Sequence, residues 1–97
     1  MYDRAEELIL ADAHVVEFLF VNPHARLIFN WTDNDGTLGE WEGELSGSTE
    51  LVRSGIYPNL VAAGDRVTVK GFAHRNDPRN LRLSAIVFPD GREVALP

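Results

Sequence analysis

The chain has 97 residues, with 15 acidic against 9 basic side chains and a formal net charge of −6. This length favours one domain with one core. The absence of cysteine excludes disulfides, thiolate zinc sites, iron–sulfur clusters and cysteine nucleophiles. No apolar run approaches the roughly 18 residues that a membrane span needs. The acidic balance disfavours nucleic acid as a partner, because phosphates attract positive charge.

The first predicted element is a long strand over residues 8–21, which is rich in Val, Leu, Ile and Phe and ends at Asn22-Pro23. Its length indicates a bent strand of the kind that closed barrels require. Residues 24–32 and 37–45 then alternate between apolar and polar side chains. Such alternation predicts two strands that each bury one face.

One register of this hairpin sets apolar side chains opposite each other. It pairs Trp31 with Gly39, Phe29 with Trp41, Leu27 with Gly43, and Ala25 with Leu45. It leaves Asn34-Asp35-Gly36 as the loop, with glycine where a positive φ is needed. The same register places Arg26 opposite Glu44 and Asn30 opposite Glu40 on the outer face, so polar pairing supports it independently.

The only helix signal follows this hairpin. Ser48 is a suitable N-cap, Thr49 to Ser54 fit a short helix, and Gly55 suits the C′ position. A further helical turn is expected over residues 59–63, before Gly64-Asp65.

Two more strands and a terminal extension complete the chain. A fourth strand is expected from Val67 to about His74, followed by a loop at residues 76–78. The fifth strand carries Leu81, Leu83, Ala85 and Val87 on its inner face. Residues 89–91 turn the chain into a short final strand over residues 93–96. The residues that we expect to be mostly buried are Leu27, Phe29, Trp41, Val67, Val69, Leu83 and Val87.

This order predicts an all-β fold with one short helix, built as a five-stranded OB-like barrel with the helix between strands 3 and 4. Residues 1–97 form a single OB-like domain in this interpretation. An open sandwich or a roll is the alternative architecture.

Several short motifs occur in a characteristic order. They are Asn22-Pro23-His24, Trp41, the segment Ser48 to Gly55, Gly64-Asp65-Arg66-Val67-Thr68-Val69-Lys70-Gly71, and Pro89-Asp90-Gly91-Arg92. In their order and spacing the chain resembles, from Tyr2 onward, a bacterial family of small exported OB-like proteins of unknown function. The resemblance implies a periplasmic or secreted protein and supplies no activity.

The chain departs from the pattern of that family in two regions. Ala13 and Phe20 stand near places where the family often has a glycine and a tryptophan. The segment Met1 to Glu7 also lacks the basic and apolar regions of a signal peptide and the family's His-rich start.

Asn22, His24 and Trp31 are the candidate ligand-binding residues. The Asn-Pro-His motif is also a good strand-ending turn, in which Asn22 would hydrogen-bond within its own turn. Trp31 shares the core face with its neighbours but lies at a strand end, where an aromatic ring can be exposed. His14, His24 and His74 are the only histidines. They would form a zinc or copper site only if the fold brought them together.

No cofactor motif and no catalytic constellation accompany these residues, so we expect no enzyme and no cofactor. Glu40, Glu42 and Glu44 are typical of the solvent face of a strand. We expect an exported, non-enzymatic binding or accessory module for a small molecule or a protein, with its oligomeric state open. The alternatives are a metal-binding periplasmic protein that uses the histidines, and a nucleic-acid-binding OB domain. The latter would need Arg75, Arg79 and Arg82 to gather beside exposed aromatic rings.

Overall fold

A computed structural model gives the fold of the chain and describes residues 6–97. Residues 1–5, which make up most of the segment Met1 to Glu7, lie outside the described residues. The elements are the strands β1 (Leu8–Leu19), β2 (Arg26–Thr32) and β3 (Leu38–Glu44), the helix α1 (Ser48–Arg53), a 3-10 helix (Pro58–Leu60), and the strands β4 (Arg66–His74), β5 (Asp77–Val87) and β6 (Glu93–Ala95).

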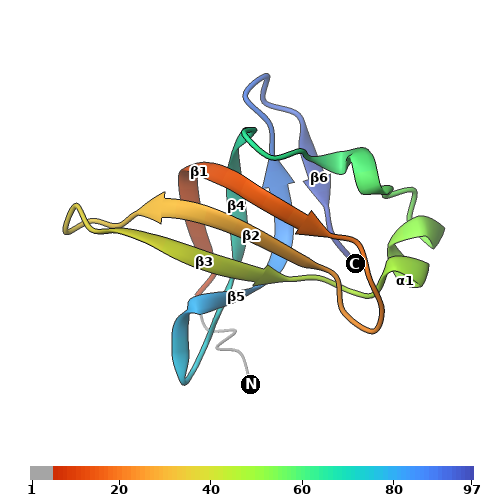
Figure 1. Cartoon of the computed structure of the whole chain (residues 1–97), viewed down its shortest axis with the longest axis horizontal. Coiled ribbons are helices and arrows are strands. Elements are labelled where there is room, and N and C mark those ends of the chain that lie inside the picture. Colours follow the sequence, from red (N-terminus) through yellow and green to blue (C-terminus); the bar gives the residue numbers. More distant parts are fainter. Residues whose placement is uncertain (1–5) are drawn as a thin grey trace.

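The strands form one curved sheet in the order β3-β2-β1-β4-β5-β6. The sheet closes because β3 also pairs with β5, in parallel, from Glu42–Asn80 to Glu44–Arg82. The first five strands therefore make a closed barrel, and α1 lies between β3 and β4 in the chain, at one end of the barrel (Figure 1). The predicted five-stranded barrel with one short helix is confirmed.

The β2–β3 hairpin has the predicted register, from Arg26–Glu44 to Thr32–Leu38. Phe29 and Trp41 are cross-strand partners whose ring centroids lie 6.4 Å apart at an interplanar angle of 22°. Gly36 in the loop has a φ of 80°. The Asp33 Oδ1 accepts the N–H groups of Asp35 and Thr37 at 2.9 and 3.0 Å, so an aspartate just before the predicted loop fixes its shape.

β1 is bent, as its length predicts, and two β-bulges account for the bend. The pairing of β1 shifts between Leu10 and Ala13 against β4, and between Val15 and Glu17 against β2. Asp12, in the first bulge, has a φ of 59°, which a non-glycine residue rarely adopts. A bulge resets the alternation of side chains, so Leu10, Ala13 and Val15 are all buried.

Two of the predicted core residues are only partly buried. Leu27, Phe29, Val67, Val69 and Leu83 are buried as expected, whereas Trp41 and Val87 are partly exposed. A bulge in β5 explains Val87, because the β4–β5 pairing shifts from Lys70–Ala85 to Gly71–Leu83 and turns Ile86 into the core instead. Trp41 lies one residue before the β3–β5 pairing, which runs from Glu42 to Glu44.

Two predicted boundaries are also wrong. The loop expected at residues 76–78 is a turn at Arg75-Asn76, and Asp77 and Pro78 already belong to β5. The helical turn expected over residues 59–63 is the 3-10 helix Pro58–Leu60, which has proline near its start. The turn at residues 89–91 is as predicted, with Gly91 at a φ of 90°.

Candidate functional site

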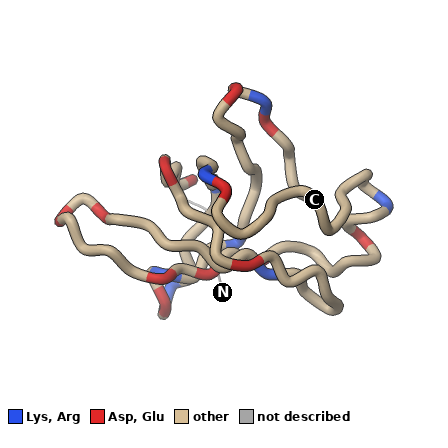
Figure 2. Tube along the Cα trace, turned by 45° about the horizontal axis from the view of Figure 1, so that its top comes forward, with Lys and Arg blue, Asp and Glu red and all other residues tan. Residues whose placement is uncertain are grey.

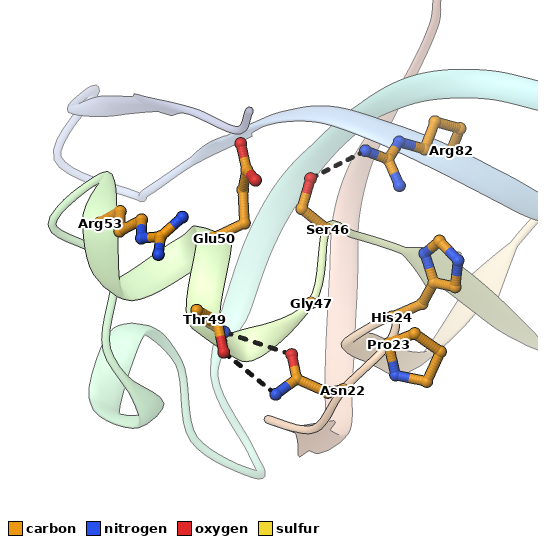
Figure 3. A pocket seen from close by; sticks show the side chains of 9 residues that line it. All are labelled: Asn22, Pro23, His24, Ser46, Gly47, Thr49, Glu50, Arg53 and Arg82. Carbon is orange, nitrogen blue, oxygen red and sulfur yellow. Dashed lines mark hydrogen bonds between the residues drawn. The ribbon is translucent and has the colours of Figure 1, made fainter.

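The Asn-Pro-His motif forms one wall of a surface pocket of about 350 Å³. The pocket lies between the β1–β2 loop, the start of α1 and the middle of β5 (Figure 3). We call it the Asn-Pro-His pocket. Its lining residues are Asn22, Pro23, His24, Ser46, Gly47, Thr49, Glu50, Arg53 and Arg82.

Asn22 joins the β1–β2 loop to the start of α1. Its Oδ1 accepts the N–H of Thr49 at 3.3 Å, and its Nδ2 donates to the Thr49 Oγ1 at 3.1 Å. The N–H of Ser48 donates to the carbonyl of Val21 at 3.0 Å. Asn22 therefore caps the helix from a distant part of the chain, and the prediction that it bonds within its own turn is wrong. The Asn22–Pro23 peptide bond is cis.

The predicted N-cap, Ser48, is the first residue of the helix, and Gly47 occupies the N-cap position without a side-chain cap. A Cβ on Gly47 would lie 2.5 Å from both the Asn22 Oδ1 and the Pro23 carbonyl oxygen. The absence of a side chain at Gly47 is what lets the Asn-Pro-His loop approach the helix. At the other end Gly55 has a φ of 81° and donates to Val52, as its predicted C′ position requires.

Two arginines enter the pocket from separate elements. Arg53 comes from the last turn of α1 and Arg82 from β5, with Glu50 and Ser46 between them (Figure 3). The Arg82 Nη2 donates to the Ser46 Oγ at 3.0 Å and to the main-chain oxygen of Pro97 at 3.3 Å. These bonds orient Arg82, whose side chain is half-buried, whereas Arg53 is exposed.

His24 lies at the edge of the pocket, beside a carboxylate. Its Nδ1 is 3.5 Å from the Glu44 Oε1, and its side chain is 55% exposed. The second histidine, His14, pairs with Asp12 on β1 at 3.6 Å. The third, His74, ends β4, where its Nδ1 accepts the N–H of Asn76 at 3.1 Å. Within residues 6–97 there is no group of three or more His, Cys, Asp or Glu side chains that could hold a metal ion, so the histidines are not brought together.

Trp31, the remaining candidate, lines a different pocket, on β1, β2 and the start of β3. It is partly buried, and its Nε1 donates to the Ala11 carbonyl oxygen at 2.9 Å. The predicted ligand-binding residues thus divide between two places: Asn22 and His24 in one, Trp31 in the other.

Comparison with known proteins gives one match. A family described as a family of unknown function, DUF6152, matches residues 1–81. The chain belongs to DUF6152. No curated protein and no solved structure matched it. The match agrees with the predicted membership of a family without a known function, and it ends before the Pro89-Asp90-Gly91-Arg92 motif.

The pocket of this DUF6152 chain is lined by two arginines and one glutamate, on a molecule of net charge −6. The β2–β3 hairpin carries acidic positions at its tip and along β3 (Figure 2). Two of the nine lysines and arginines, Arg53 and Arg82, line the pocket. The described residues include no helix long and apolar enough to cross a membrane.

Sequence reasoning missed Ser46, Arg53 and the pocket role of Arg82. Closeness in sequence groups Arg82 with Arg75 and Arg79. In this DUF6152 chain Arg75 lies in the β4–β5 turn, and the guanidinium of Arg79 lies over Gly39 on β3. The predicted barrel was the one feature that could have placed Arg82 near the pocket. Its closing strands, β3 and β5, set Glu44 opposite Arg82.

Proposed function

We propose that this protein is an exported, non-enzymatic binding module that holds a small anion in the Asn-Pro-His pocket. The observation that carries the proposal is that Arg53 and Arg82 both line one polar pocket in a chain of net charge −6. A carboxylate or phosphate accepts hydrogen bonds from guanidinium groups in a favourable fork geometry. The ligand class is therefore a small carboxylate or phosphate.

Arg82 is the anchor of this site. Its bonds to Ser46 and Pro97 fix the guanidinium in place, and a guanidinium has five N–H donors in total, so donors remain for a ligand. Arg53 is exposed on α1 and is free of that constraint, which suits a residue that closes over a ligand. Glu50 lies beside them and lowers the net positive charge of the pocket.

The geometry favours this function over the two alternatives. A metal site would need ligands in a cluster, whereas His14 and His24 each pair with a single carboxylate in separate places. A nucleic-acid surface would need a continuous basic patch. Arg79 lies over Gly39, Arg82 is engaged with Ser46, and Glu42 and Glu44 adjoin β5.

Export is the part of the proposal that rests on the family resemblance alone. Its test is to express the complete gene product in its source cell and to measure its share in the periplasmic and secreted fractions. Recovery in the cytoplasm alone would refute export and leave the binding proposal standing.

The binding proposal is tested by calorimetric titration with inorganic phosphate, propionate and propionamide. Propionamide is the matched control, because it has the shape of propionate without its charge. We expect phosphate or propionate to bind and propionamide not to bind. Arg53→Gln should weaken binding about tenfold, the effect of one lost charge-assisted hydrogen bond. Arg75→Gln, on the exposed β4–β5 turn, should leave it unchanged. Equal effects of the two substitutions, or no binding of any anion, would overturn the proposal.

A further inference from the structure

The second pocket, which contains Trp31, has a volume of about 420 Å³ and lies away from the Asn-Pro-His pocket. Its lining residues are Ala11, Asp12, His14, Asn30, Trp31, Thr32 and Leu38. We call it the Trp31 pocket. From its chemistry we propose that the Trp31 pocket binds a neutral carbohydrate ring.

Trp31 supplies an apolar surface in a fixed orientation. Its Nε1, the only hydrogen-bond donor of an indole, is already bonded to the Ala11 carbonyl oxygen at 2.9 Å. Its ring meets Trp41 edge-on, at a centroid distance of 5.3 Å and an angle of 90°. The indole N–H is bonded to β1 and Trp41 packs against the ring, so Trp31 has no free donor and can offer a ligand only its carbon atoms. Such a surface matches the C–H face of a sugar ring.

The other side chains of the pocket are mostly polar and of mixed hydrogen-bonding character. Asp12 accepts, while Asn30, Thr32 and His14 can each both donate and accept. A hydroxyl group also does both, so the hydroxyls of a ring match the Asp12 and His14 side chains in kind. The side chains of Asp12 and His14 are 68% and 47% exposed, so a ligand can reach both. An apolar wall with a few polar groups around it is the usual composition of a small-molecule site.

Charge excludes a phosphate-bearing ligand from this pocket. Asp12 lines it, and Glu40 lies opposite Asn30 in the β2–β3 register. A nucleotide would stack on Trp31 but would bring its phosphate against these carboxylates. The neutral ring avoids that repulsion.

The backbone conformation of Asp12 supports its role as a hydrogen-bond acceptor in the pocket. Its φ of 59° costs energy in a residue with a side chain, and glycine would adopt it without strain. The bulge directs the carboxylate toward His14, 3.6 Å away, at the edge of the pocket. An acceptor is thereby held where a ring stacked on Trp31 would place its hydroxyls.

The test is a titration followed by NMR at the indole N–H groups, of which the chain has two because it has two tryptophans. Trp31→Phe assigns the Trp31 signal. The probes are maltotriose, cellotriose and chitotriose, with choline and a dT oligonucleotide as charged comparators. We expect at least one trisaccharide to shift the Trp31 signal with a Kd of about 1 mM or tighter, and the two comparators to leave it unchanged. The side-chain signals of Arg53 and Arg82 should not move, since the inference does not depend on the Asn-Pro-His pocket.

Asp12→Asn is the test variant, because asparagine tolerates a positive φ and loses the charge. It should weaken trisaccharide binding about tenfold. Asp35→Asn is the matched control, an exposed carboxylate in the β2–β3 loop, and should have no effect. Three outcomes would overturn the inference: no trisaccharide shifts the Trp31 signal, both substitutions act alike, or only choline or the oligonucleotide binds there.

Discussion

Asn22 caps the helix α1 from 27 residues away in the chain, with its amide bonded to both the N–H and the hydroxyl of Thr49. This contact fixes the Asn-Pro-His loop against the helix and so shapes the pocket between them. Asn22→Ala should lower the free energy of unfolding by about 1 kcal/mol, the usual effect of losing a helix cap. Urea denaturation measures the change, with Asn59→Ala, an exposed residue of the 3-10 helix, as the control. Equal stability of the two variants would refute the capping role.

Gly47 makes this contact sterically feasible. Gly47→Ala should destabilise the protein by about 1–3 kcal/mol, because its Cβ would lie 2.5 Å from the Asn22 Oδ1 and the Pro23 carbonyl oxygen. The effects of Gly47→Ala and Asn22→Ala on stability should be coupled, because the new Cβ would displace the Asn22 Oδ1. In a double-mutant cycle Asn22→Ala should therefore cost less in the Gly47→Ala background. Strict additivity would show that Gly47 and Asn22 act independently.

Phe29 and Trp41 should contribute unequally to the free energy of unfolding. Phe29 has no exposed surface, so Phe29→Ala should cost about 3–5 kcal/mol. Against a typical total stability of about 5–15 kcal/mol, that loss could unfold so small a barrel. Trp41→Ala should cost less, because the ring is partly exposed. Thermal unfolding ranks the two variants, and a larger loss at Trp41 would contradict the observed burial.

The fold was predictable where local patterns carry its determinants. Alternating faces and a Gly36 turn specify the β2–β3 register, and the helix lies within one residue of its expected start. The errors come from bulges and from contacts between distant segments. The bulge that exchanges Ile86 for Val87 has no signature in the alternation of β5, and the cap supplied by Asn22 depends on the folded loop.

The candidate site was predictable only in part for the same reason. Asn22 and His24 are found in the pocket, but Arg53 and Arg82 reach it from α1 and β5 once the barrel has closed. Trp31 and His14 both line the second pocket, from the paired strands β2 and β1. Which side chains share a pocket follows from how the strands pair, and the sequence around each residue does not specify that pairing.

Nucleic acid should not bind at physiological salt, because 15 acidic side chains oppose 9 basic ones. Fluorescent single-stranded DNA and RNA titrated at about 150 mM salt, where the Debye length is about 8 Å, provide the measurement. Micromolar binding that is lost in the double variant Arg79→Glu, Arg82→Glu would contradict the prediction. It would make the nucleic-acid OB domain the better account.

The central claim is that the Asn-Pro-His pocket is an anion site, and residue-resolved NMR tests it most directly. Inorganic phosphate and propionate are titrated into the protein while the guanidinium signals of Arg53, Arg82 and Arg75 are followed. We predict saturable shifts at Arg53 and Arg82, none at Arg75, and no response to propionamide. Shifts spread equally over the three arginines, or no saturable shift at Arg82, would contradict the claim.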